Sequence, residues 1–144
     1  MLDWIKTKLT ELEGEVAKYN NAGFLDAVVA ASVIVAAADG EITPDEKTKM
    51  LKFVQTNSLL KAFNTQAVIR SFNRFAESYE FDRGIGFDEA IKAVRSVTDA
   101  DQRRLLIRVA VAIARANGTI EASEEAVIRK LCSELGQNPS EFLA

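Results

Sequence analysis

The chain has 144 residues, of which 48% are apolar and 27% are charged, and its net charge at pH 7 is −3. This balance predicts one soluble globular domain with a substantial core, and the lack of a basic stretch argues against a nucleic-acid partner. The chain contains no histidine and one cysteine, which excludes Ser-His-Asp and Cys-His nucleophiles, imidazole zinc sites and an internal disulfide.

Apolar residues at helical spacing organise the first half of the chain. Residues 2–18 form an amphipathic pattern, and residues 23–39 are apolar on most faces, which predicts a central buried helix. The apolar run 27–38 is 12 residues long, whereas a bilayer span needs about 20. The N-terminus lacks the build of a signal peptide, so we expect a cytoplasmic protein. Two further helices are predicted over residues 44–57 and 65–79, followed by a loop over residues 80–86 that contains Gly84 and Gly86.

The second half continues with helices and shows no alternating strand pattern. A short helix is predicted over residues 87–97, and residues 98–101 supply a turn and an N-cap for a second apolar helix that runs to about residue 116. The last long helix covers residues 123–135 and ends at Gly136, and a final turn over residues 138–141 returns Phe142 and Leu143 to the core. The sequence therefore predicts an all-α fold of about seven helices, in one domain over residues 1–144.

A short acidic segment occurs twice. Residues 39–46, DGEITPDE, recur 78 residues later as NGTIEASE, residues 117–124, and the alignment of residues 27–54 with 105–132 gives 7 identities in 28 positions. Each copy follows an apolar helix and precedes an amphipathic one. The repeat predicts a pseudo-twofold duplication with halves of about residues 1–82 and 83–144.

Two interpretations fit the repeated segment. In the structural one, Gly40 takes the left-handed position after a helix, and residues 43–46 form a capping box with proline at the first helical position. In the functional one, the acidic residues bind a metal. Asp39 lies at a helix C-terminus, where the helix dipole disfavours it by about 0.3–1 kcal/mol. Glu124 also persists in the second copy, although Glu121 replaces the Thr43 cap.

If the two segments lie side by side, their oxygen atoms can be pooled around one hard divalent cation such as calcium, magnesium or manganese. The candidate ligands are Asp39, Glu46, Asn117 and Glu124, with Glu41, Asp45 or Glu121 as outer ligands. An EF-hand is excluded, because its front-half ligand positions are Val35 and Ala37 in one copy and Ile113 and Arg115 in the other. None of these can bind calcium through its side chain.

The chain resembles the TerB family of tellurite-resistance proteins over nearly its whole length. The resemblance is carried by Ala37-Ala38-Asp39-Gly40 with Glu46-Lys47, by Ser78-Tyr79-Glu80-Phe81-Asp82 with Ile85-Gly86, by residues 112–124 and by the ending Leu135-Gly-Gln-Asn-Pro-Ser-Glu-Phe142. It implies an all-helical, pseudo-symmetric domain in a bacterial response to tellurite, other toxic agents and phage. It also implies metal chelation through Asp39, Glu46 and Glu124, and an integral-membrane TerC-like partner reached from the cytoplasmic face. The chain departs from the family at Asn117, where Asp is usual.

Three functions compete at this point. The leading one is a non-enzymatic, cation-binding adaptor that acts through partner proteins, and its acidic segments favour a cation over the tellurite oxyanion as the bound species. The second is a metal-independent interaction scaffold, in which those segments are structural caps and the surface of the first helix, with Trp4, makes the contacts. The third is a metal-dependent hydrolase, which would need a cleft and an open coordination position that the sequence does not reveal.

Four other features have simple structural interpretations. Cys132 lies on an apolar helix stripe and is expected to be buried. Three arginines near one end of the second apolar helix are expected to face solvent or to pair with Asp99 and Asp101: Arg103, Arg104 and Arg108. Acidic residues flanking the midpoint are expected to be solvated or to begin a helix: Glu80, Asp82, Asp88 and Glu89. Trp4 is expected to belong to the core unless it is an exposed anchor.

Overall fold

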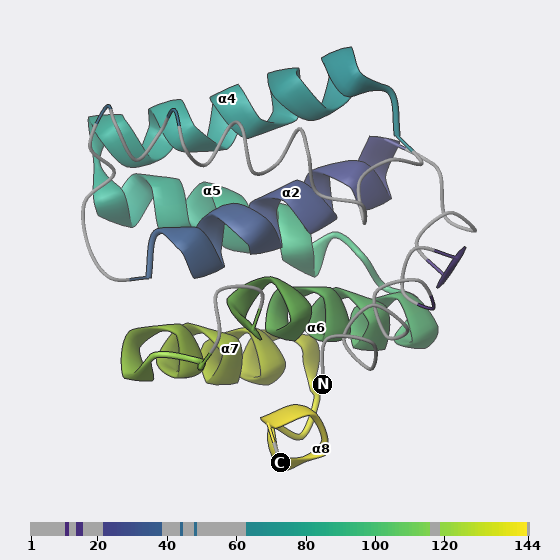
Figure 1. Cartoon of the computed structure of the whole chain (residues 1–144). Helices are drawn as coiled ribbons and strands as arrows, with labels where there is room; N and C mark the ends of the chain where they lie inside the picture. The colour runs from purple at the N-terminus through teal and green to yellow at the C-terminus, as the bar shows by residue number, and fades with distance from the viewer. Residues whose placement is uncertain are drawn as a thin grey trace.

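A computed structural model of the chain describes residues 11, 14–15, 22–38, 44, 48, 63–115 and 119–143. Six helices have defined bounds: α2 (Ala22–Ala36), α4 (Thr65–Phe81), α5 (Arg83–Arg95), α6 (Ala100–Arg115), α7 (Ala122–Leu135) and α8 (Ser140–Leu143). The described residues contain no strand, so the all-α prediction is confirmed. Figure 1 shows α2, α4 and α5 packed together, with α6, α7 and α8 forming a second group beside α2.

Helix α2 is the centre of the described structure. Eleven of its 15 residues are buried, and it contacts α4, α5, α6 and α7. Small residues such as Ala27 and Ala30, both 0% exposed, allow neighbouring helices to approach closely on several sides. The one buried polar side chain of this helix is Ser32, whose hydroxyl donates to the Val28 carbonyl at 2.8 Å. The prediction of a central buried helix is confirmed, and no described helix is long and apolar enough to cross a membrane.

The predicted loop over residues 80–86 is wrong. Helix α4 continues to Phe81, and α5 begins at Arg83, so Asp82 alone separates the two helices. The Asp82 backbone N–H donates to the Ser78 carbonyl at the end of α4, and its carboxylate accepts from the Ile85 N–H at 3.0 Å at the start of α5. One residue therefore ends one helix and caps the next.

Gly86 explains why the sequence looked like a loop at this point. A Cβ atom on Gly86 would lie 2.5 Å from the Tyr79 Cα and 2.6 Å from the Tyr79 backbone nitrogen. Glycine is thus required because the first turn of α5 crosses the backbone of α4 at van der Waals distance. The glycine is a mark of helix packing rather than of a turn.

The C-terminal third follows the predicted pattern. The Asp99 carboxylate accepts from the Gln102 N–H at 3.0 Å at the start of α6, and α7 ends at Gly136, which has a left-handed backbone with φ 67°. The Asn138 Oδ1 atom accepts from the Ser140 N–H at 3.1 Å and caps α8. Phe142 and Leu143 are partly buried against the core, as expected.

Several predictions fall outside the described residues. Trp4 is one of them, and so is most of the predicted helices over residues 2–18 and 44–57, of which only residues 11, 14–15, 44 and 48 are described; these five are helical. The single domain over residues 1–144 and the pseudo-twofold duplication with its halves 1–82 and 83–144 stay predictions.

Candidate functional site

The two helices that precede the repeated acidic segments lie against each other. Helix α2 ends at Ala36 and continues into a turn at Ala37 and Ala38, directly before Asp39, and α6 ends at Arg115, two residues before Asn117. The two helices are in contact, and in Figure 1 both run from right to left. Their C-terminal ends therefore point the same way, so the chain leaves both helices toward the same side of the bundle.

Of the four candidate ligands, Glu124 is the one that the structure describes. It lies in the first turn of α7 and is partly buried. Its Oε1 atom accepts a hydrogen bond from the Glu121 backbone N–H at 2.9 Å. Asp39, Glu46 and Asn117 lie outside the described residues, as do the proposed outer ligands Glu41 and Asp45.

This hydrogen bond corrects one step of the sequence argument. In the sequence, the replacement of the Thr43 cap by Glu121 indicates that the second copy lacks a capping box, which favours a ligand role for Glu124. The structure shows that Glu121 is the N-cap residue of α7 and that the Glu124 side chain satisfies its backbone N–H. Capping alone therefore accounts for a glutamate at this position.

The described residues contain no cluster of acidic or thiol side chains that could hold a metal. Among residues 11, 14–15, 22–38, 44, 48, 63–115 and 119–143, no group of three or more Cys, Asp or Glu side chains is placed to hold an ion. The candidate ligands of the repeated acidic segments are mostly outside these residues. In those segments the donor set consists of carboxylate and amide oxygens, which suit hard divalent cations.

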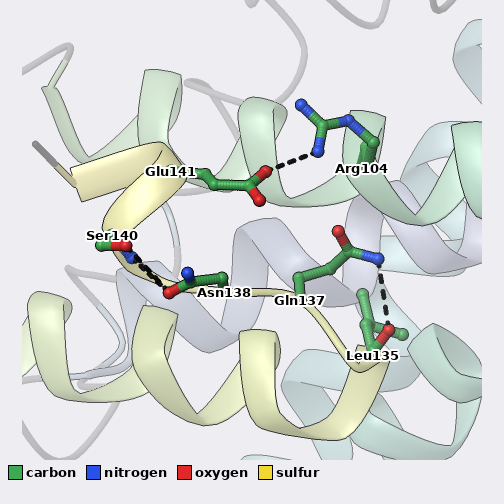
Figure 2. A network of polar contacts seen from close by, with 6 residues as sticks. All are labelled: Arg104, Leu135, Gln137, Asn138, Ser140 and Glu141. Carbon is green, nitrogen blue, oxygen red and sulfur yellow. Dashed lines mark hydrogen bonds and ion pairs between the residues drawn. The ribbon is translucent and has the colours of Figure 1, made fainter.

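The three arginines of α6 have partners other than those expected. Arg104 forms an ion pair with Glu141 at 2.6 Å and stacks over the Phe142 ring at 5.3 Å, which fastens α8 to α6. Figure 2 shows this pair beside the Asn138–Ser140 and Gln137–Leu135 contacts. Arg104 is exposed, which is one of the two expected alternatives, but none of the three arginines pairs with Asp99 or Asp101, and Asp99 instead caps the start of α6.

The other two arginines also hold segments together. The Arg103 guanidinium donates to the Val97 carbonyl at 2.7 Å and lies 3.5 Å from the Leu135 carbonyl, so it joins the turn before α6 to the end of α7. Arg108 pairs with Glu15 from the N-terminal part of the chain. The arginines are therefore structural, and this part of α6 offers no phosphate site.

Sequence reasoning missed one polar residue inside the central helix. Asp26 lies on α2 among buried neighbours, accepts from the Ser71 hydroxyl at 2.9 Å and lies 3.6 Å from Arg74. Both partners belong to α4, so Asp26 ties the two helices together. A carboxylate in an otherwise apolar stretch was the available signal.

Two buried side chains, Cys132 and Tyr79, have a raised pKa. Burial of Cys132, which is 0% exposed as expected, raises the pKa of its thiol, and nearby Arg129 lowers it by less. Burial likewise raises the pKa of Tyr79 to about 12, against an opposing contribution from Arg83. Both groups are thus held in their neutral forms, and neither has the lowered pKa that an activated nucleophile requires.

Comparison with known proteins identifies the family of the chain. The family model described as "Tellurite resistance protein TerB" matches residues 25–144. A curated relative from an Alcaligenes species, named "Tellurium resistance protein TerB", is 33% identical over 114 residues, which cover 76% of this chain and 93% of the relative. No solved structure matches the chain significantly. The chain belongs to the TerB family of tellurite-resistance proteins.

Proposed function

We propose that this protein is a non-enzymatic, divalent-cation-binding adaptor in a tellurite and stress resistance system, and that it acts through partner proteins. Its membership of the TerB family supports the resistance context. The observation that carries the cation-binding part is the parallel course of α2 and α6, which are in contact and end on the same side of the bundle. Each of these helices is followed within a few residues by one copy of the acidic segment.

The proposed ligands are Asp39, Glu46, Asn117 and Glu124, and the proposed ions are calcium, magnesium or manganese. An all-oxygen set of three carboxylates and one amide suits such cations. The capping role of Glu124 is compatible with this proposal, because a carboxylate has two oxygen atoms and about four lone-pair positions. One hydrogen bond to the Glu121 N–H leaves the second oxygen available.

For the partner and the location, we propose an integral-membrane TerC-like protein, reached by this chain from the cytoplasmic side. No described helix is a candidate membrane span. We propose no role for nucleic acid, because the net charge is −3 and phosphate backbones bind basic surfaces.

Titration calorimetry with calcium, manganese and magnesium tests the cation site. We expect at least one ion to bind the wild-type protein, and we expect the variant Asp39→Ala/Glu46→Ala to bind it at least about tenfold more weakly, equivalent to about 1.4 kcal/mol. The variant Asn117→Asp adds a carboxylate and should tighten binding. No binding of any of the three ions, or equal binding by the double variant, would reject the proposal.

Two substitutions of Glu124 separate the ligand role from the capping role. Glu124→Gln keeps an oxygen that can accept from the Glu121 N–H but removes the charge, so it should weaken cation binding and leave the free energy of unfolding nearly unchanged. Glu124→Ala removes both and should also destabilise the protein by about 0.5–2 kcal/mol. Glu125→Gln is the matched control, because Glu125 lies beside Glu124 in the same turn and pairs with Arg129. Full affinity in Glu124→Gln would assign Glu124 to capping alone.

A metal-independent interaction scaffold is the second candidate function. It is favoured by the hydrogen bond between Glu124 and the Glu121 N–H, which explains part of the acidic repeat without a metal. It predicts unchanged calorimetric traces in all the variants above, together with a loss of stability in Glu124→Ala. The same set of measurements therefore distinguishes the two functions.

A further inference from the structure

The corner between α4 and α5 carries an exposed apolar surface. Phe81 is 81% exposed and Ile85 is 45% exposed, and among the described residues these are the two large hydrophobic side chains that are exposed. Their backbones lie close together, because three residues separate them and the Asp82 carboxylate accepts from the Ile85 N–H. Gly84, between them in sequence, adds no side chain. We call Phe81 and Ile85 the corner pair.

Exposure of the corner pair is not required by the fold. The adjacent Tyr79 and Gly86 are buried and form the contact between the two helices. Polar residues at positions 81 and 85 would suit the ends of the two helices equally well, as Asp82 does between them. A phenylalanine that exposes four-fifths of its surface leaves a large aromatic side chain available as a binding anchor.

The surroundings of the corner pair are strongly acidic. Segment 77–89 carries five carboxylates and one guanidinium, a net charge of −4, whereas the whole chain has −3, so the remaining residues together sum to +1. On α4, Glu77 lies one helical turn before Phe81, and on α5, Asp88 and Glu89 lie one turn after Ile85, all three of them exposed. The segment that carries the two most exposed large hydrophobic side chains of the described residues is thus acidic on balance.

We propose that the corner pair and its acidic rim bind a basic amphipathic segment of a partner protein, one that presents an aliphatic or aromatic side chain flanked by lysines or arginines. Charge complementarity selects this occupant. A second copy of the chain, docked symmetrically, would place the acidic rim against itself, and an anionic membrane surface would repel the same carboxylates. The proposal deepens the adaptor part of the proposed function by stating the chemistry of a partner, and it does not depend on the cation site.

The test uses the full-length protein in the presence of a chelator, so that its result is independent of the cation titrations. A short fluorescein-labelled amphipathic peptide of leucine and lysine is the probe, and its fluorescence anisotropy reports binding. We expect Phe81→Ser/Ile85→Ser and Glu77→Gln/Asp88→Asn/Glu89→Gln each to weaken binding at least about tenfold. Asp82 is left intact in both variants because it caps α5.

Two controls separate specific docking from general charge attraction. Asp101→Asn/Glu134→Gln/Glu141→Gln removes the same number of carboxylates from α6, α7 and α8 and should change the affinity by less than about twofold. A peptide with serine in place of leucine keeps the charge and should bind at least about tenfold more weakly. Thermal melts check that every variant is folded.

Three results would overturn the proposal. One is the absence of peptide binding by the wild-type protein. Another is equal weakening by the control triple variant, which would indicate general attraction of cations. The third is a concentration-dependent dimer, measured by sedimentation, that Phe81→Ser/Ile85→Ser abolishes, because this would assign the corner pair to self-association.

Discussion

The crossing of α4 and α5 determines the burial of Tyr79 and, through it, the pKa of the phenol. The close approach of Gly86 places the first turn of α5 over the Tyr79 backbone, and the side chain is left with 8% of its surface exposed. Removal from water disfavours the phenolate more than the neutral phenol. The pKa is therefore raised from 10.0 to about 12, although the Arg83 guanidinium acts in the opposite direction.

This shift predicts a loss of stability at alkaline pH. Below pH 10 the phenol is protonated in both the folded and the unfolded chain, so its contribution is constant. Between pH 10 and 12 the unfolded chain ionises while the folded chain does not, and the free energy of unfolding falls as pH rises. We expect Tyr79 to account for about 1.4 kcal/mol of loss at pH 11 and at most about 2.7 kcal/mol above pH 12.

Urea unfolding at pH 8, 10 and 11 measures this effect, with Tyr79→Phe as the matched variant. The difference between the two proteins isolates Tyr79 from the other groups that titrate in this range. The phenylalanine variant should lose about 1.4 kcal/mol less than the wild type between pH 8 and pH 11. Parallel pH dependence in both proteins would show that the hydroxyl is hydrated in the folded state.

Individual capping residues were only partly predictable. Asp99 and Gly136 were identified because their residue types strongly prefer helix ends. Glu121 was not identified as a cap, because glutamate is an uncommon N-cap residue. Its position at the start of α7 is stabilised by the Glu124 carboxylate, which accepts from the Glu121 backbone N–H. The sequence pattern records which side chain is present but not which hydrogen bond it makes.

At the scale of helices, the link between α4 and α5 is a single residue. Asp82 has an extended backbone, with φ −160° and ψ 126°, and it acts at once as the C-cap of α4 and the N-cap of α5. The carboxylate satisfies the Ile85 N–H, which would otherwise lack an intrahelical partner. Because the residue is exposed, its contribution is that of a cap and not of a buried contact.

Replacing this cap should destabilise the helix pair in a graded way. Asp82→Ala should lower the free energy of unfolding by about 0.5–2 kcal/mol, whereas Asp82→Asn, which retains the acceptor oxygen, should come within a few tenths of a kcal/mol of the wild type. Asp88→Ala is the control, because Asp88 is exposed on the same helix and has no capping role. Chemical denaturation of the three variants and the wild type measures their free energies of unfolding and checks this order. Equal losses in Asp82→Ala and Asp88→Ala would point to a general charge effect.

The positions of the helices were largely predictable, and their junctions were less so. Amphipathic periodicity located α4 and α7 to within two residues at each end. The error at residues 80–86 arose because two glycines in seven residues are typical of a loop, whereas Gly86 is present to admit a neighbouring backbone. Such a requirement depends on the three-dimensional crossing of helices, which single-helix periodicity does not encode.

For the whole molecule, the arrangement around α2 determines what the candidate site can be. The sequence predicted a buried central helix, and the structure adds that α2 and α6 are neighbours with the same direction. The described parts of the two helices therefore end on the same side of the bundle. The contact itself results from packing small residues of α2 against four other helices.

This close packing makes a final prediction about Ala30, which is 0% exposed near the middle of α2. Ala30→Leu inserts a branched side chain where no space is available, and overpacking of this kind typically costs about 1–3 kcal/mol. Ala36→Leu is the control, because Ala36 is the exposed last residue of the same helix and leucine has nearly the same helix propensity as alanine.

Thermal unfolding compares the two variants. Ala30→Leu should lower the Tm by roughly 3–10 °C for a chain of this size, and Ala36→Leu should change it little. Because α2 also orients the chain that leads to Asp39, Ala30→Leu should weaken cation binding as well, if the site depends on the register between α2 and α6. A destabilised variant that retains full cation affinity would mean that the acidic segments bind independently of the bundle beneath them.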